Sequence, residues 1–88
     1  MKVVFTRDFD KAAGKIKDKK LASDLLNTIN NVKLATNIFQ ITNLKKLKGH
    51  PCAYRIRIGN YRIGVFIENN EVEFAAFAHR KDIYFLFP

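Results

Sequence analysis

The chain has 88 residues, which suffices for one domain with a single hydrophobic core and leaves little room for a second domain. Sixteen Lys and Arg residues against eight Asp and Glu give a net charge of +8, so the expected partners are nucleic acid, an anionic membrane or an acidic protein. Because 48% of the residues are hydrophobic, the composition excludes a disordered basic tail.

The cysteine content and the N-terminal segment bear on the cellular compartment. Cys52 is the single cysteine, which excludes an internal disulfide and suits a reducing compartment. The segment MKVVFTRDF has too short an apolar run for a secretory signal, and no stretch approaches membrane-spanning length. We therefore expect a cytoplasmic protein that does not cross a membrane.

The N-terminal half predicts one strand followed by two helices. Lys2–Phe5 is short, β-branched and aromatic, which indicates a strand. Thr6 can cap a helix over about Arg7–Ile16, where two acids in the first turn favour the positive end of the helix dipole. After a polar break, apolar residues at helical spacing predict a second helix over about Lys20–Leu34. The apolar stripe of this helix needs a partner.

Residues 54–66, YRIRIGNYRIGVF, predict a β-hairpin, because two alternating runs flank a Gly-Asn dipeptide that suits a two-residue turn. In this register the facing pairs are Ile58 with Tyr61 and Arg57 with Arg62. Alternation then places Arg55, Arg57 and Arg62 on one side of the sheet with no acid among them. Since like charges facing each other destabilise a sheet, we expect this positive charge to bind an anion such as phosphate.

Asn69-Asn70 is a second plausible two-residue turn. The facing apolar pairs would be Ile67 with Val72, Val65 with Phe74 and Ile63 with Ala76. On the other face the pairs would be Arg62 with Phe77 and Phe66 with Glu73, with His79 at the strand end on the arginine-bearing side. Both turns predict the same buried face, and such agreement is typical of a foldable sequence.

These elements predict an α+β fold. An N-terminal strand is followed by a helical hairpin that packs on one face of an antiparallel sheet, in the order β-α-α-β-β-β. Ile83–Phe87 predict either a short additional strand or an apolar tail that finds a partner. No repeat or linker interrupts the chain, so residues 1–88 form one domain.

The segment Leu47–Tyr84 resembles the core of the RelE/ParE superfamily of bacterial toxins from toxin–antitoxin pairs. The resemblance rests on a Leu-Lys-Gly turn, a Tyr-Arg-x-Arg strand, a Gly-x-Tyr-Arg turn and strand, and a closing His-Arg-Lys-Asp-x-Tyr. It implies a strand–helix–helix–sheet fold over the whole chain. RelE-like members cleave messenger RNA on the ribosome, whereas ParE-like members inhibit DNA gyrase and are not nucleases.

Metal-independent RNA cleavage needs a base for the 2′-hydroxyl proton, cations that hold the phosphate, and an acid for the leaving oxygen. Isolated cysteine and histidine residues give no metal-ligand cluster, so we expect no metal and no other cofactor. By position, the resemblance implies that five residues do this work, namely Arg55, Arg57, Arg62, Arg80 and Tyr84. Tyr84 could also stack on a base.

The identity of the general base is open. RelE-type nucleases carry lysines on the first hairpin strand, whereas this chain has arginines, which do not lose their proton at accessible pH. His79 is the first candidate, although an isolated histidine near a strand end is more often structural. Lys48 and His50 are second candidates, and Arg80 or Lys81 could stabilise or protonate the leaving group. We expect Lys45, Lys46, Lys48 and Lys81 to contact RNA.

The leading hypothesis is a ribosome-dependent messenger-RNA endoribonuclease, the toxin of a two-gene module. The resemblance implies a cognate antitoxin that wraps the toxin, and an acidic segment would suit the charge. The alternative is a ParE-like inhibitor that binds gyrase and catalyses nothing. A stand-alone RNA-binding module would explain the charge but not the combination of motifs.

Overall fold

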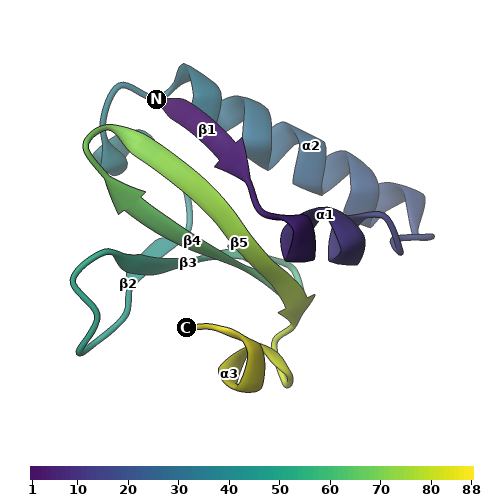
Figure 1. The fold of residues 1–88 in the computed structure, drawn as a ribbon. Helices are drawn as coiled ribbons and strands as arrows, with labels where there is room; N and C mark the ends of the chain where they lie inside the picture. Colours follow the sequence, from purple (N-terminus) through teal and green to yellow (C-terminus); the bar gives the residue numbers. More distant parts are fainter.

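The computed structural model describes residues 1–88 and forms a five-stranded sheet with helices on both faces (Figure 1). The elements in chain order are β1 (Lys2–Phe5), α1 (Arg7–Ala13), α2 (Lys19–Leu34), the 3₁₀ turn η1 (Ile38–Gln40), β2 (Leu44–Lys46), β3 (Ala53–Ile58), β4 (Tyr61–Glu68), β5 (Glu71–His79) and α3 (Ile83–Leu86). The strand order is β1-β5-β4-β3-β2, with β1 parallel to β5 and the other pairs antiparallel. The predicted α+β architecture is confirmed.

Side-chain caps fix where the two N-terminal helices begin. The Thr6 hydroxyl accepts a hydrogen bond from the Phe9 amide, and the Asp18 carboxylate accepts from two amides in the first turn of α2. The first helix ends earlier than expected, at Ala13, where Gly14 is the C-cap. The amides of Lys15 and Ile16 then donate hydrogen bonds to carbonyls three residues earlier, so the α-helical pattern does not continue. The two helices then cover one face of the sheet (Figure 1).

The main core lies between these helices and the sheet. Phe9, Leu25 and Val32 contribute buried side chains from the helices. The strands contribute a larger buried set, comprising Ile56, Ile58, Ile63, Val65, Ile67, Val72, Phe74 and Phe77. Burial of this apolar surface stabilises the fold and supplies the partner that the stripe of α2 requires.

The strand register is confirmed as far as a β-bulge and is wrong beyond it. The turn-proximal pairs Ile67 with Val72, Val65 with Phe74 and Phe66 with Glu73 are as predicted. The register shifts between Gly64 and Val65, because β5 holds one extra residue there. Ile63 therefore pairs with Phe77 instead of Ala76, and Arg62 pairs with Ala78 instead of Phe77.

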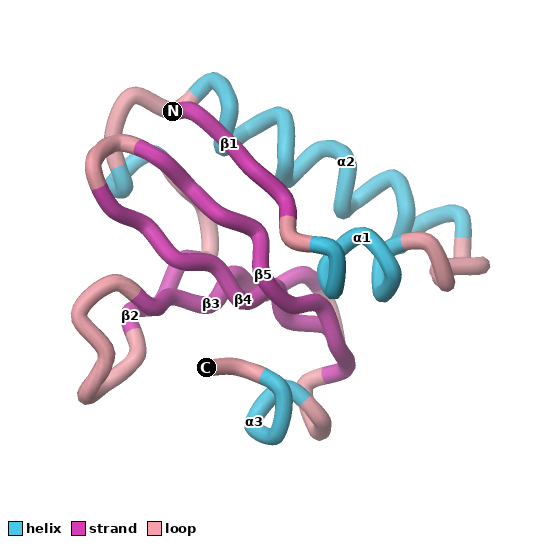
Figure 2. The backbone as a smooth tube through the Cα atoms, viewed as in Figure 1, coloured by secondary structure: helices cyan, strands magenta, loops and turns pink.

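The C-terminal residues form a short helix on the face opposite α1 and α2, so the expectation of an extra strand is wrong. Figure 2 shows this segment folding back beneath the strands. Ile83 and Phe87 are buried in a second small core together with Leu47, Ala53 and Ala76. The domain thus covers Ile83 and Phe87, whereas Phe85 and Leu86 of the apolar tail stay exposed.

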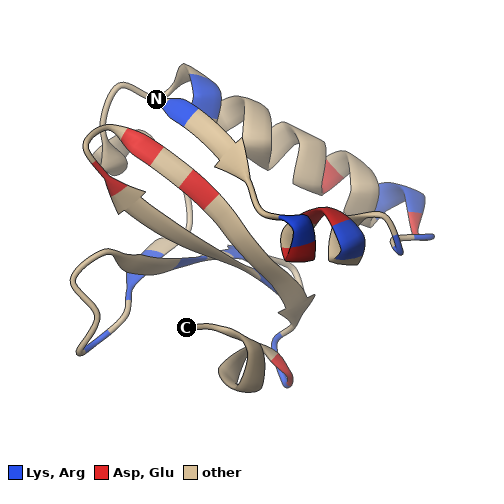
Figure 3. Cartoon of the chain, viewed as in Figure 1, with Lys and Arg blue, Asp and Glu red and all other residues tan.

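Charge is distributed unevenly over the sheet. Figure 3 shows the acidic residues of β4 and β5 close to the turn that joins these strands. The charged residues of β2 and β3, in contrast, are all Lys or Arg. Lys45 and Lys46 lie on β2, a strand that the sequence did not predict. None of the helices is long and apolar enough to cross a membrane.

Candidate nucleic-acid interface

Three of the four predicted arginines gather in one depression on the face of the sheet that carries α3. Arg57 pairs with Arg62 across β3 and β4, and Lys45 on β2 pairs with Arg55. The guanidinium carbon of Arg55 lies 5.1 Å from the centre of the Tyr84 ring. We call this depression of about 390 Å³ the arginine groove; its lining is Asn43, Leu44, Lys45, Arg55, Arg57, Arg62 and Tyr84.

Arg62 lies at the most crowded point of the positive charge. Its guanidinium donates to the backbone carbonyls of Gly59 at 3.0 Å and Tyr61 at 2.9 Å. The pKa of Arg62 is lowered from its ordinary value, first by partial burial and then by the positive charges of Arg57, Arg80 and Arg55. Arginine remains protonated at accessible pH, so the repulsion persists until an anion relieves it.

No carboxylate neutralises the arginine groove. The two ion pairs of the protein lie elsewhere, Lys2 with Glu71 at 3.6 Å and Lys20 with Asp24 at 3.2 Å. The Nε atom of Arg55 is buried and has no hydrogen-bond partner. Buried donors are normally paired, so this atom and its neighbours have unused capacity for an acceptor such as a phosphate oxygen.

The groove continues in both directions along the sheet. Toward the loop after β2, a second depression shares Lys45, Arg55 and Tyr84 with the first; it adds Lys46, Leu47, Lys48, His50, Phe87 and Pro88. Toward the β3–β4 turn, a third depression shares Asn43, Arg57 and Arg62 and adds Arg80, whose amide donates to the Asn60 carbonyl at 2.8 Å. A continuous basic track is the arrangement that follows a nucleic-acid backbone.

Two predicted residues lie outside this track. His79 pairs with Tyr61 on the helix-bearing face, and the two rings are 5.4 Å apart, so its predicted position on the arginine-bearing face is wrong. The bulge is the cause, because one extra residue in β5 reverses the alternation of the residues that follow it. Lys81 does not line the groove, and its amide donates to Nδ1 of His79 at 3.2 Å.

Some groove residues were not predicted from the sequence. Asn43 lines both the arginine groove and the depression at the β3–β4 turn, and it adopts a positive φ of 63°. Asn is one of the few residues that tolerate this conformation, so a turn before β2 was the available signal. Asp24, Asn27 and Thr28 reach the same depression from α2, and helical periodicity alone does not indicate this contact. No three His, Cys, Asp or Glu side chains gather as metal ligands.

Comparison with known proteins relates this geometry to a family. The chain is 42% identical over 62 residues to toxin RelE3 of Methanocaldococcus jannaschii, an alignment that covers 70% of this chain and 61% of that toxin. The structure matches a RelB-RelE antitoxin-toxin complex from Methanococcus jannaschii with a TM-score of 0.81 at 29% identity, covering 97% of this chain and 99% of that one. The fold is thus that of a RelE-like protein.

More distant structures share the fold alone. An archaeal RelE-RelB complex from Pyrococcus horikoshii OT3 matches with a TM-score of 0.73 at 18% identity, covering 90% of this chain and 93% of that one. No protein-family model matches the sequence. Sequence and fold together make this chain RelE-like, and the RelE names of its relatives do not favour the ParE alternative.

Proposed function

We propose that this chain is the toxin of a toxin–antitoxin module and that it cleaves messenger RNA on the ribosome without a metal ion. The single observation that carries the proposal is the arginine groove, in which Arg55, Arg57 and Arg62 lie together with no carboxylate partner. The name of the M. jannaschii relative, a RelE toxin, supports the same assignment. An unneutralised cluster of this kind fits a phosphate whose charge grows during reaction.

In this reaction the 2′-oxygen of the RNA attacks the adjacent phosphorus atom while the bond to the 5′-oxygen breaks. The products are a 2′,3′-cyclic phosphate and a 5′-oxygen, which takes up a proton from water to give the free 5′-hydroxyl. Arg57 and Arg62 hold the phosphate oxygens, and Arg80, in the adjoining depression at the β3–β4 turn, offsets charge on the leaving oxygen. Tyr84, which is exposed and already lies over Arg55, offers its free ring face to a base.

The proton of the 2′-hydroxyl requires an acceptor on the groove side of the sheet. His79 lies on the other face, so it does not reach the groove. His50 and Lys48 line the depression that continues the groove past Arg55, and we assign the acceptor role to His50 because an imidazole is a common proton acceptor. Lys46 donates to the His50 carbonyl at 3.2 Å and so helps to fix this loop.

The proposed protein partner is a cognate antitoxin, because the solved relatives are RelB-RelE complexes. With a net charge of +8, this chain would attract an acidic segment that covers the basic track and blocks RNA. Both partners would act in the cytoplasm, where Cys52 stays reduced.

Induced expression with separate readouts of protein and DNA synthesis tests the proposal. We expect protein synthesis to fall first and cut messages to accumulate. Arg62→Ala should lower cleavage about 100-fold or more, the usual loss when a group that stabilises transition-state charge is removed. Arg7→Ala, an exposed arginine at the start of α1, is the matched control and should remain toxic. Toxicity that survives Arg62→Ala, or an early fall in DNA synthesis, would overturn the proposal.

A further inference from the structure

The depression between α2 and the β3–β4 turn differs chemically from the rest of the basic track. It has a volume of about 620 Å³ and adjoins the arginine groove through Arg57 and Arg62. Its other walls carry a third arginine, Arg80, and three side-chain amides, from Asn27, Asn43 and Asn60. These amides make no hydrogen bond within the protein, so their donors and acceptors are free. We call this depression the turn pocket.

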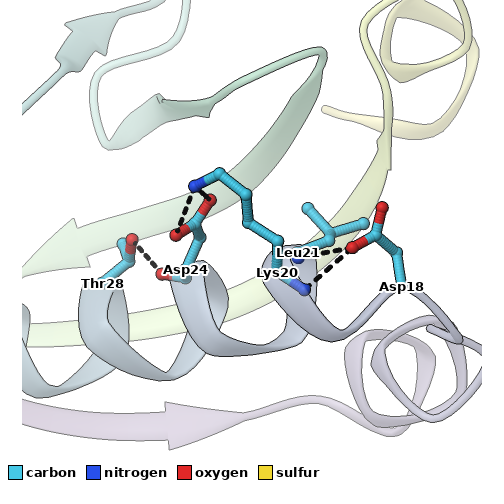
Figure 4. Close-up of polar contacts among 5 residues, drawn as sticks. All are labelled: Asp18, Lys20, Leu21, Asp24 and Thr28. Atoms are coloured by element: carbon cyan, nitrogen blue, oxygen red, sulfur yellow. Dashed lines mark hydrogen bonds and ion pairs between the residues drawn. The ribbon is translucent and has the colours of Figure 1, made fainter.

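Asp24 supplies the carboxylate of the turn pocket. Figure 4 shows its side chain meeting that of Lys20 on one side of α2, with Thr28 one turn further along. The Thr28 hydroxyl donates to the Asp24 backbone carbonyl at 2.8 Å, so Lys20 is the one side chain that bonds to the carboxylate. The Lys20 contact is an exposed pair at 3.2 Å, and pairs of this kind contribute little and exchange partners readily.

A carboxylate beside arginines weakens their attraction for a phosphate at that point, because the two anions repel each other. It favours instead a neutral group that donates hydrogen bonds. Side-chain amides beside a carboxylate are typical of sites that read the polar edge of an unstacked base, while arginines nearby hold the backbone. The turn pocket therefore suits a nucleobase whose phosphate lies in the arginine groove.

We propose that the turn pocket binds guanine and thereby sets the base preference of the RNA cleaved in the adjoining groove. The inference rests on the proposed function in that RNA is the substrate. Guanine presents two neighbouring donors, N1–H and N2–H, which a carboxylate can accept together. Adenine and cytosine place a ring-nitrogen acceptor beside a single amino group, and uracil has one N–H between two carbonyls. Asp24 thus favours guanine, and the amide of Asn27 or Asn43 can donate to its O6.

Nucleotide titration of the purified protein, followed by NMR chemical shifts, tests this proposal without relying on cleavage. The probes are GMP, AMP, CMP and UMP, which share ribose and phosphate, with inorganic phosphate as a fifth ligand. We expect GMP to bind about five-fold more tightly or better than the other nucleotides. Asp24→Asn replaces one of the two acceptor oxygens with an N–H donor and should abolish this preference without weakening the binding of phosphate. Lys20→Ala, the matched control, keeps the carboxylate and should retain the preference.

The outcomes separate this inference from the proposed function. Equal affinity for the four nucleotides, absence of nucleotide binding, or a guanine preference that persists in Asp24→Asn would overturn the assignment of the turn pocket. Messages cut with the same base preference before and after Asp24→Asn would do the same while leaving the nuclease intact. Asp24-dependent binding of GMP by a protein that cuts no message would instead refute the proposed function alone.

Discussion

Gly64→Ala tests how the C-terminal segment is held against the sheet. Gly64 lies on β4 directly beneath Phe87, and a Cβ atom built there would approach ring carbons of Phe87 at 2.4 to 2.7 Å. Such distances require a shift, so the ring must leave its site. In the wild type Phe87 is 5% exposed and its ring centre lies 4.9 Å from that of Phe66. The added methyl group therefore removes the last buried contact of the chain.

The cost follows from the surface that Phe87 buries. Returning a buried Phe side chain to water costs about 1.5–3 kcal/mol, and overpacking a site of this kind costs about 1–3 kcal/mol. We expect Gly64→Ala to lower the free energy of unfolding by about 1–3 kcal/mol in urea titrations. Phe87→Ala should cost a similar amount, and it leaves space above Gly64 that the new methyl group can fill.

A double-mutant cycle identifies the cause. Gly64→Ala made in the Phe87→Ala background should be close to neutral, which gives a coupling energy of about 1–3 kcal/mol between the two positions. If Gly64→Ala lowers the free energy of unfolding equally with and without the Phe87 ring, contact with that ring is not the reason why position 64 requires glycine. Hydrogen exchange of α3 supplies a second readout, since a displaced ring should raise exchange in Ile83–Leu86.

Two further substitutions test the fold and the groove. Thr6→Ala should lower the free energy of unfolding by about 1–2 kcal/mol, measured in thermal or urea unfolding. The substitution removes the N-cap of α1 and the hydrogen bond from the Thr6 hydroxyl to the Ala75 carbonyl. Thr6→Ser keeps the hydroxyl and should retain most of this stability. His79→Ala should leave toxicity and cleaved messages unchanged while lowering stability slightly, because the ring contacts Tyr61 on the helix-bearing face. Loss of cleavage by a folded His79→Ala protein would contradict this placement.

Much of the sheet could be predicted from local chemistry. Gly59, Asn69 and Asn70 all have positive φ, the conformation that their residue types tolerate and that two-residue hairpin turns require. Because each turn fixes its register, the pairing of Arg57 with Arg62 and of Ile67 with Val72 followed directly. The arginine cluster was predictable because it depends only on a turn and on alternation.

The parts that could not be predicted depend on long-range contacts. A β-bulge inserts one residue without a strong sequence signal, so the positions of Phe77 and His79 were assigned to the wrong face. The short strand β2 gains its order from pairing with β3, and its three residues carry no alternating pattern. Residues 83–87 form a helical turn because a second small core lies beneath them.

The bulge also explains how one strand serves both faces of the sheet. Up to Phe74, the core-facing residues of β5 alternate regularly, and the Thr6 hydroxyl then donates to the Ala75 carbonyl, which helps to fix the irregularity. Beyond it, the large Phe77 packs in the main core, and the small Ala76 and Ala78 turn to the arginine-bearing face. A regular strand would put Phe77 on that face, where it would compete with the C-terminal segment for space. The bulge thus provides the shallow surface on which α3 rests and from which Tyr84 reaches the arginine groove.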